Sequence, residues 1–363
     1  MKSKKIALIM GDGIGKEVIP EAKQILLTIA NHTDHRFDFL EIPAGGEVWK
    51  ETGQSITDAS FEKLRTVDAI VLGALGIPGL PQGVAEYAVL KIRQEFNQYV
   101  NLRPIFLYEP LRDICPLKDE FIGDGINMFI LRENSEGIYS KIGGKVQDRA
   151  TIDTMIFTEL GVKRILEFAF EFAHKKNHTR ICSVDKANLL YTSTMWRSMF
   201  KELGEKYPNL EKKSYYIDAF CQWLIRAPYQ FQTVVSSNMF GDIISDEAAF
   251  LAGSLGMVAS ANLNPSPNGI SMFEPIHGSA PDIAGDNIAN PIASILSIGL
   301  MMELVFADSY IGEILHHSIA SVLETHRTPD IYPKIKEKPK VKKVTTQEMG
   351  KLIQNIVSNE LRK

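Results

Sequence analysis

The chain has 363 residues, of which 45% are hydrophobic and 23% are charged, and its formal net charge is −4. This length allows one large domain or two ordinary ones, and the slight acidity argues against nucleic-acid binding as the main function. No apolar run reaches the length of a membrane span, and the apolar run 6–10 is too short for a signal peptide. We therefore expect a cytoplasmic protein without membrane contact.

Strands and helices are expected to alternate from the N-terminus onward. Strands are predicted at 5–10, 37–42 and 68–73, and the first is followed by a glycine loop and a helix with apolar side chains at helical spacing. The third strand is nearly all apolar, which is typical of a central parallel strand covered on both faces. The alternation predicts an α/β fold with a largely parallel sheet.

A second group of elements follows. Strands are predicted at 124–131, 179–184 and 233–237, with an amphipathic helix over 161–174. A long apolar helix is expected from Ala249, and a buried helix over 291–306. The basic stretch 334–343 is expected to be a solvated loop. Three widely spaced cysteines give no disulfide framework or metal-binding pair, and Cys182 and Cys221 are expected to be buried.

The glycine loop Gly11–Glu17 lies between the first strand and its helix. Its glycines stand at positions 11, 13 and 15, which fits neither the dinucleotide fingerprint nor the phosphate loop. Two interpretations have equal weight: a tight turn with close backbone approach, or a contact with a nucleotide.

Residues 273–291 have little periodicity and are predicted to form a long, shaped loop. The loop carries backbone donors, an imidazole and amide groups that could surround an adenosine diphosphate. These residues are His277, Gly278, Ser279, Asp282, Asn287 and Asn290.

A predicted helix over 86–96 places a carboxylate, two aliphatic side chains and an arginine on one face. Glu86, Val89, Leu90 and Arg93 recur at steps of three and four, so they can line a pocket with an apolar middle. Arg103 and Arg132 follow, and arginine binds carboxylates through a bidentate fork. Each arginine alone could be a structural ion pair, but the set favours a dicarboxylate ligand.

Four further side chains are candidates for chemistry. Asp242 and Asp246 are four residues apart, so on a helix they point the same way and could hold Mg²⁺ or Mn²⁺. From these two residues alone, an exposed acidic helix start is the favoured alternative. Lys186 follows an apolar strand, where desolvation could make it a base, and Tyr139 could donate a proton. In isolation, both are more often ordinary surface or packing residues.

Five motifs in order resemble the β-decarboxylating dehydrogenases of (2R,3S)-malate derivatives, the isocitrate/isopropylmalate dehydrogenase family. They are Gly-Asp-Gly-Ile-Gly, Asn-Leu-Arg-Pro, Arg-Glu-Asn-Ser-Glu-Gly-Ile-Tyr, Asn-Met-Phe-Gly-Asp-Ile-Ile-Ser-Asp and Glu-Pro-Ile-His-Gly-Ser-Ala-Pro-Asp-Ile-Ala-Gly. The resemblance runs from Ile6 to about Asp330, and it implies a homodimer with shared active sites that acts on a small malate-type substrate.

The resemblance also implies residue roles. The malate carboxylates are expected on Arg93, Arg103 and Arg132, and the metal on Asp242, Asp246 and, from the other subunit, Asp218. Lys186 of the other subunit is expected to serve proton removal, and Tyr139 to help protonate the enol. The pocket for the malate substituent is expected at Glu86, Val89, Leu90 and, across the dimer, Leu189. NAD is expected on His277, Gly278, Ser279, Ala280, Asp282, Ile283 and Asn290, because Asp282 suits a free ribose hydroxyl and repels a 2′-phosphate.

The aliphatic pocket favours 3-isopropylmalate, which would be converted to 2-oxoisocaproate in leucine biosynthesis. Segments 93–101 and 260–265 instead resemble the tartrate/D-malate enzymes. Isocitrate or homoisocitrate is a further alternative, and a catalytically silent regulatory paralogue a remote one. The implied fold has two domains, residues 1–99 with 254–363 for the cofactor and residues 100–253 for the metal, substrate and dimer contacts. An arm is expected around 142–151.

Overall fold

Strands and helices alternate along most of the chain, so the predicted α/β class is confirmed. The computed structural model describes residues 3–81, 83–147, 149–333 and 340–363, and most of the basic stretch 334–343 lies outside the described residues. The chain packs as two units. Unit 1 comprises Met1–Phe96, Tyr108–Cys115 and Ala252–Lys363, and unit 2 comprises Asn97–Leu107 and Pro116–Leu251. The roles assigned to the two expected domains stay predictions.

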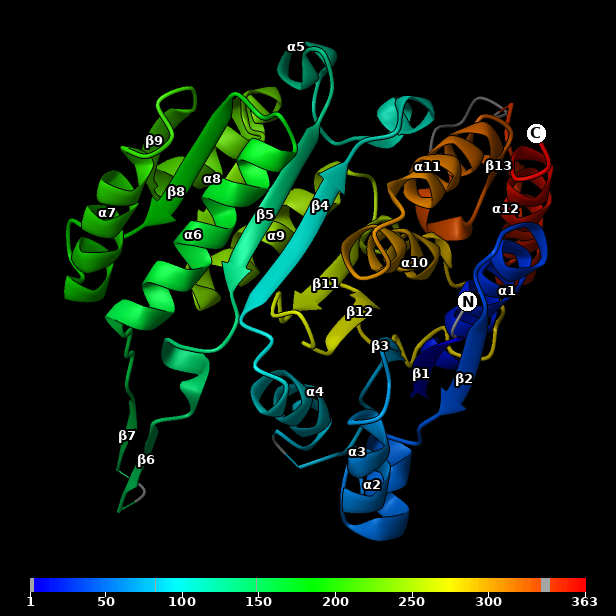
Figure 1. Cartoon of the computed structure of the whole chain (residues 1–363), viewed down its shortest axis with the longest axis horizontal. Helices are drawn as coiled ribbons and strands as arrows, with labels where there is room; N and C mark the ends of the chain where they lie inside the picture. Colours follow the sequence, from blue (N-terminus) through cyan, green and yellow to red (C-terminus); the bar gives the residue numbers. More distant parts are fainter. Residues whose placement is uncertain (1–2, 82, 148, 334–339) are drawn as a thin grey trace. The chain divides into compact units, whose positions relative to one another are not determined.

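Unit 1 has the strand order β2-β1-β3-β12-β11, in which only the β11–β12 pair is antiparallel (Figure 1). Its strands are β1 (Lys4–Gly11), β2 (Phe37–Glu41), β3 (Ala69–Ala74), β11 (Ala259–Leu263), β12 (Ser271–Pro275), β13 (His326–Arg327) and β14 (Lys342–Lys343). Its helices are α1 (Gly15–His32), α2 (Gly46–Thr52), α3 (Asp58–Leu64), α4 (Val84–Glu95), α10 (Ile292–Leu304), α11 (Ser309–Leu323), α12 (Thr346–Glu360) and the short turns η1 (Glu109–Ile114), η4 (Leu255–Met257) and η5 (Pro329–Ile331).

Both faces of the unit 1 strands are buried, as expected for parallel strands covered by helices. On one face, Ile9, Leu72 and Met272 join a core with Phe61 of α3 and Ile92 of α4. On the other face, α1 and α10 pack against β3. The predicted buried helix near 291–306 is confirmed as α10, which is buried along most of its length.

Unit 2 has the strand order β4-β5-β10-β8-β9, in which only the β4–β5 pair is antiparallel. Helices α6 and α7 pack together on one side of these strands, and α8 and α9 pack together on the other (Figure 1). The strands are β4 (Val100–Phe106), β5 (Asn127–Glu133), β6 (Gly143–Val146), β7 (Ala150–Asp153), β8 (Arg180–Asp185), β9 (Glu211–Tyr216) and β10 (Thr233–Ser236). The helices are α5 (Asp119–Ile122), α6 (Glu159–Lys175), α7 (Tyr191–Gly204), α8 (Ile217–Arg226), α9 (Asn238–Leu251) and the turns η2 (Ile138–Ser140) and η3 (Pro228–Gln230).

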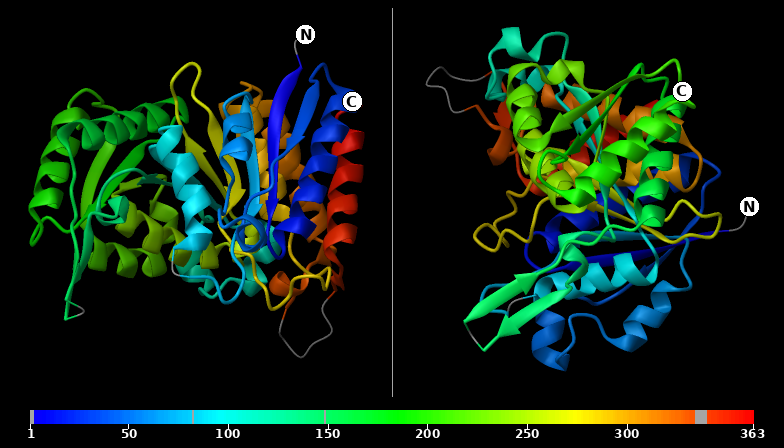
Figure 2. Two further views of the ribbon diagram at one scale, coloured as in Figure 1. Left: turned by 90° about the horizontal axis from the view of Figure 1, so that it is seen from below. Right: turned by 90° about the vertical axis from the view of Figure 1, so that its left-hand side faces the viewer.

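The arm predicted around 142–151 is confirmed as the antiparallel hairpin β6–β7, which extends away from the rest of unit 2 (Figure 2). Its apolar side chains are largely uncovered within the chain: Ile142, Val146 and Ile152 are each about half exposed. Apolar side chains on an extended hairpin gain nothing from exposure, so this arm is suited to packing against another surface.

Two predictions are wrong. The apolar helix expected from Ala249 ends at Leu251, because Gly253 adopts a left-handed φ of 106°, and the next apolar run is the strand β11. Periodicity cannot distinguish a short apolar strand from a helix. Cys182 is buried as expected, but Cys221 is only half-buried, because part of the apolar surface of α8 is uncovered within this chain. No helix in the described ranges is long and apolar enough to cross a membrane.

Candidate active site

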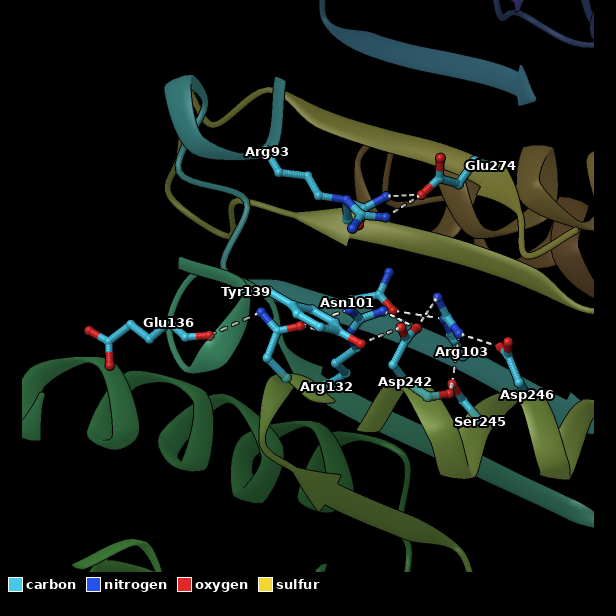
Figure 3. A network of polar contacts seen from close by, with 12 residues as sticks. Arg93, Asn101, Arg103, Arg132, Glu136, Tyr139, Asp242, Ser245, Asp246 and Glu274 are labelled. Carbon is cyan, nitrogen blue, oxygen red and sulfur yellow. Dashed lines mark hydrogen bonds and ion pairs between the residues drawn. The ribbon is translucent and has the colours of Figure 1, made fainter. Parts of the chain in front are cut away.

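Two buried arginines and two aspartates form a charged cluster in unit 2 (Figure 3). Arg103 comes from β4 and Arg132 from the neighbouring strand β5, and the two side chains are 7% and 4% exposed. Arg103 Nη1 lies 2.9 Å from Asp246 Oδ1, and Arg103 Nη2 lies 3.3 Å from Asp242 Oδ1. Arg132 Nη1 donates to the same Asp242 oxygen. The cluster therefore holds two cations and two anions, and the aspartates face the arginines.

Helix α9 is positioned to bring both aspartates to this cluster. Asp242 and Asp246 are one turn apart on α9, which follows β10 directly. Gly241 allows the approach, because a Cβ there would lie 2.8 Å from the Arg132 side chain. Asp242 lies in the second turn of α9 and contacts buried arginines. The alternative interpretation, a solvated acidic residue at the start of the helix, therefore does not hold for Asp242.

Polar residues around the arginines fix their orientation. Asn238 Oδ1 accepts from Arg132 Nε at 3.0 Å and from Nη2 at 2.7 Å, and Asn238 Nδ2 donates to the Glu136 carbonyl. Asn101 Oδ1 accepts from Arg103 Nε, and Ser245 Oγ accepts from Arg103 Nη1. These three residues were not singled out by the sequence analysis, because an amide or hydroxyl has no recognisable spacing of its own.

Tyr139 lies beside Asp242 and Arg132. Its hydroxyl donates to Asp242 Oδ2 at 3.5 Å, and the Arg132 guanidinium carbon lies 5.6 Å from the ring centroid. Burial, and then the negative charge of Asp242, raise the pKa of the Tyr139 phenol above its usual value. The phenol is therefore protonated at neutral pH and can donate a proton.

The aspartate pair offers oxygen ligands of the kind that Mg²⁺ and Mn²⁺ take. The Asp246 side chain is 60% exposed, so one edge of the pair is accessible. The pKa of the Asp246 carboxyl is raised, mainly by partial burial. The positive charge of Arg103 lowers this pKa, and the negative charge of Asp242 raises it further. No group of three or more His, Cys, Asp or Glu side chains able to hold a metal ion exists within the described residues. The pair thus fits a divalent cation, but one chain does not assemble all three expected ligands.

Lys186 and Asp218, which the resemblance assigns to a partner subunit, contact each other within one chain. Lys186 Nζ lies 2.6 Å from Asp218 Oδ1, and this hydrogen bond lowers the pKa of the Asp218 carboxyl. The backbone at Lys186 is anchored by buried Asp185, which accepts two hydrogen bonds from Arg197. Leu189 is 73% exposed, so its predicted pocket role requires cover from outside this chain.

In unit 1, the face of α4 predicted from the sequence is formed as expected over Val84–Glu95. Glu86 is exposed, Val89 and Leu90 are half-buried, and Arg93 Nη2 donates to Glu274 Oε1 at 2.9 Å. Buried Arg93 Nε has no hydrogen-bond partner within the described chain, so it can still bind an anion. Glu274 was assigned to the loop, but it belongs to β12.

The loop that follows β12 carries a hydrogen-bond acceptor that has no partner among the described residues. His277 Nδ1 lies 2.9 Å from the Gly278 carbonyl. Because a carbonyl only accepts, Nδ1 carries the hydrogen and Nε2 is an acceptor. Burial lowers the pKa of His277, so the ring is neutral, and its buried Nε2 has no partner among the described residues. An exposed amino group, such as that of adenine, would satisfy this atom.

The other expected cofactor residues lie along the same loop. Asp282 is exposed, Ala280 and Ile283 are half-buried, and Ser279 is buried. Asn290 is also buried. Its Nδ2 donates a hydrogen bond to Asp330, and its Oδ1 accepts one from the backbone N–H of Ile292. The structure therefore gives Asn290 a role in holding the loop.

The glycine loop packs directly on this segment. Ile14 N donates to the Ser279 carbonyl at 2.9 Å, and a Cβ on Gly13 would lie 2.1 Å from that oxygen. The close backbone approach considered from the sequence is therefore present. Buried Asp12 accepts from the backbone N–H groups of Gly46 and Gly76. It ties the loop to the start of α2 and the end of β3, a role the sequence analysis missed.

Comparison with known proteins adds independent information. A model of the isocitrate/isopropylmalate dehydrogenase family matches residues 5–353. The 3-isopropylmalate dehydrogenase of Clostridium acetobutylicum is 40% identical over 361 residues, covering 97% of this chain and 99% of the relative. That of Geobacter metallireducens is 40% identical over 359 residues, covering 96% and 98%.

Two solved structures are similar over nearly the full length. The isocitrate dehydrogenase of Methylococcus capsulatus has a TM-score of 0.85 at 29% identity, and the alignment covers 99% of this chain and 100% of that one. The β-decarboxylating dehydrogenase of Thermococcus kodakarensis in its apo form has a TM-score of 0.77 at 33% identity, covering 98% and 96%.

Proposed function

The chain belongs to the isocitrate/isopropylmalate dehydrogenase family and is a decarboxylating dehydrogenase, and from this premise we propose that it oxidises a (2R,3S)-3-substituted malate with NAD and a divalent metal. The observation that carries the proposal is the cluster of Arg103, Arg132, Asp242 and Asp246. It joins cations that suit carboxylates with carboxylates that suit a metal. The preferred substrate is 3-isopropylmalate, which would place the enzyme in leucine biosynthesis.

The charge balance of the cluster supports a dicarboxylate and a divalent cation together. In the structure the two arginines are neutralised by the two aspartates. A divalent cation at Asp242 and Asp246 would leave two buried guanidinium charges to be balanced, and a malate dianion supplies two carboxylates. Either ligand alone would leave an uncompensated charge, so each is expected to favour binding of the other.

The reaction divides between bound groups and protein side chains. When bound, NAD accepts the hydride, and Mg²⁺ or Mn²⁺ supplies positive charge beside the oxygen that becomes negative. Arg103 and Arg132 hold the carboxylates and orient the hydrogen-bearing carbon. Lys186 receives the hydroxyl proton, and Tyr139 gives a proton to the enol carbon after CO₂ leaves.

The active unit is a homodimer with shared sites. Asp242 and Asp246 would bind the metal with Asp218 of the partner subunit, and Lys186 of the partner subunit would face the same substrate. The exposed apolar side chains of the arm, together with Trp223 on α8 and Phe250 on α9, support an extensive contact.

Pocket chemistry supports the substrate and cofactor choice. Val89 and Leu90 offer aliphatic walls, which suit an isopropyl substituent, and Leu189 of the partner subunit would close the pocket. Asp282 is exposed on the loop and would accept from ribose hydroxyls while repelling a 2′-phosphate. The 40% identity to 3-isopropylmalate dehydrogenases adds to this support.

A substrate panel tests the proposal directly. NAD reduction would be measured with Mn²⁺ and, in turn, 3-isopropylmalate, D-malate, isocitrate and homoisocitrate, with NADP as a parallel cofactor. The highest kcat/KM is expected with 3-isopropylmalate and NAD. A higher kcat/KM with D-malate would refute the substrate, and no turnover with any of the four would favour a silent binding subunit.

A further inference from the structure

A cavity in unit 2 is lined by the first residues of β8 and β10 and by one face of β9, and neither Lys186 nor Asp218 is among its described lining residues. The empty space there, counted together with the open solvent at its mouth, is about 300 Å³. Glu211, Lys213 and Tyr215 contribute to its lining, and they share one face of β9 because they are two residues apart.

A guanidinium group at this cavity has unused donors. Arg180 lines it, and among the described residues its side chain makes no hydrogen bond or ion pair. Glu211 instead pairs with Lys213 at 2.6 Å, and Arg180 acts on Glu211 only at longer range. The backbone N–H of Arg180 is held by Gln232 Oε1 at 2.9 Å. The backbone of Arg180 is therefore held in place, while its guanidinium group is available to bind a ligand.

A second donor lines the same cavity. The Nε2 group of Gln230 is buried and has no hydrogen-bond acceptor within the described part of the chain. The free-energy cost of burying an amide donor without a partner is larger than the net gain from a typical hydrogen bond. A ligand that places an acceptor at Gln230 Nε2 would remove this cost. Besides Glu211 and Lys213, the rest of the lining includes the apolar and aromatic residues Ile181, Cys182, Tyr215 and Phe231 and the polar residues Gln232 and Thr233. Phe231 is 3% exposed, and its ring packs edge-on against Tyr215 with centroids 5.7 Å apart.

We propose that this cavity binds a small monocarboxylate with a compact aliphatic tail. The carboxylate lies between Arg180 and Gln230 Nε2, and the tail lies against Phe231 and Tyr215. A carboxylate is favoured over an amine because Arg180 repels a cation, and Glu211, the one carboxylate among the described lining residues, already has Lys213 as its partner.

Calorimetric titration of the full-length protein with sodium isovalerate tests the proposal. We expect a dissociation constant on the order of 1 mM, about tenfold weaker binding of the neutral isostere isovaleramide, and weaker binding of L-leucine, whose ammonium group would meet Arg180. Undetectable binding at high millimolar isovalerate would overturn the proposal, as would isovaleramide or L-leucine binding as tightly as isovalerate.

Variants locate the site. Arg180→Met and Gln230→Leu should each weaken isovalerate binding by about tenfold. Lys212→Met is the matched control, since Lys212 is on β9 between two lining residues but points to the other face. Lys186→Met removes a residue of the candidate active site. Both controls should bind isovalerate as the wild type does; loss in Lys186→Met, or no loss in the two cavity variants, would refute this location.

Discussion

Replacing Asn238 by alanine should damage both stability and substrate binding, because this amide orients Arg132. The Asn238 oxygen accepts two hydrogen bonds from the buried guanidinium, at 3.0 and 2.7 Å. Hydrogen bonds to a charged donor contribute about 1.5–3 kcal/mol each to stability. Water that replaces the missing side chain would restore part of this contribution, so we expect the free energy of unfolding to fall by about 3 kcal/mol. A mispositioned Arg132 should also raise KM by about tenfold or more while changing kcat less.

Urea unfolding and initial-rate kinetics measure these effects on the same samples. Asn238→Asp keeps the oxygen acceptor and should retain most of the stability. Asn355→Ala, on an exposed position of α12, is the control for loss of an asparagine from a helix. If Asn238→Ala unfolds at the wild-type urea concentration and has the wild-type KM, then Arg132 does not depend on this amide for its position.

Three further predictions address the base, the cofactor and pH. Lys186→Met should nearly abolish oxidation while sparing decarboxylation of a supplied β-keto acid; equal losses would contradict separate roles. The double variant Asp282→Lys with Ile283→Tyr should shift preference from NAD toward NADP, and an unchanged cofactor ratio would contradict the loop assignment. Burial raises the pKa of Glu21 from 4.5 to about 7. The folded state therefore binds this proton more tightly, and the free energy of unfolding should fall between these pH values by up to about 3 kcal/mol. Glu21→Gln should abolish that fall in urea titrations at pH 4.5 and 8, and an unchanged pH dependence would refute the assignment.

Long, strongly patterned elements were predictable from the sequence. The strand at 68–73 and the helix near 291–306 are apolar over most of their length, and both are present as β3 and α10. The strand β11 was predicted as helix because its five residues are too few to show a period. Tertiary packing, which periodicity does not encode, determines that these residues form a strand.

The candidate site was predictable only in part. The family resemblance drew attention to Arg103, Arg132, Asp242 and Asp246, and the structure brings these four together. The residues alone favoured an acidic helix start, because the arginines are more than a hundred positions away in sequence from the aspartates. The Arg93–Glu274 pair was missed for the same reason: it depends on where β12 lies beside α4, and no local pattern reports that.

The sharing of each active site between two subunits is tested most directly with mixed dimers. Lys186→Met and Asp242→Asn homodimers should each be nearly inactive. In a hybrid dimer, one site would combine an intact Asp242 from one chain with an intact Lys186 from the other. Mixing the two variants under conditions of subunit exchange should therefore restore about a quarter of wild-type activity, because about half the dimers are hybrids with one working site each. Confirmed exchange with no recovery of activity would contradict the shared site.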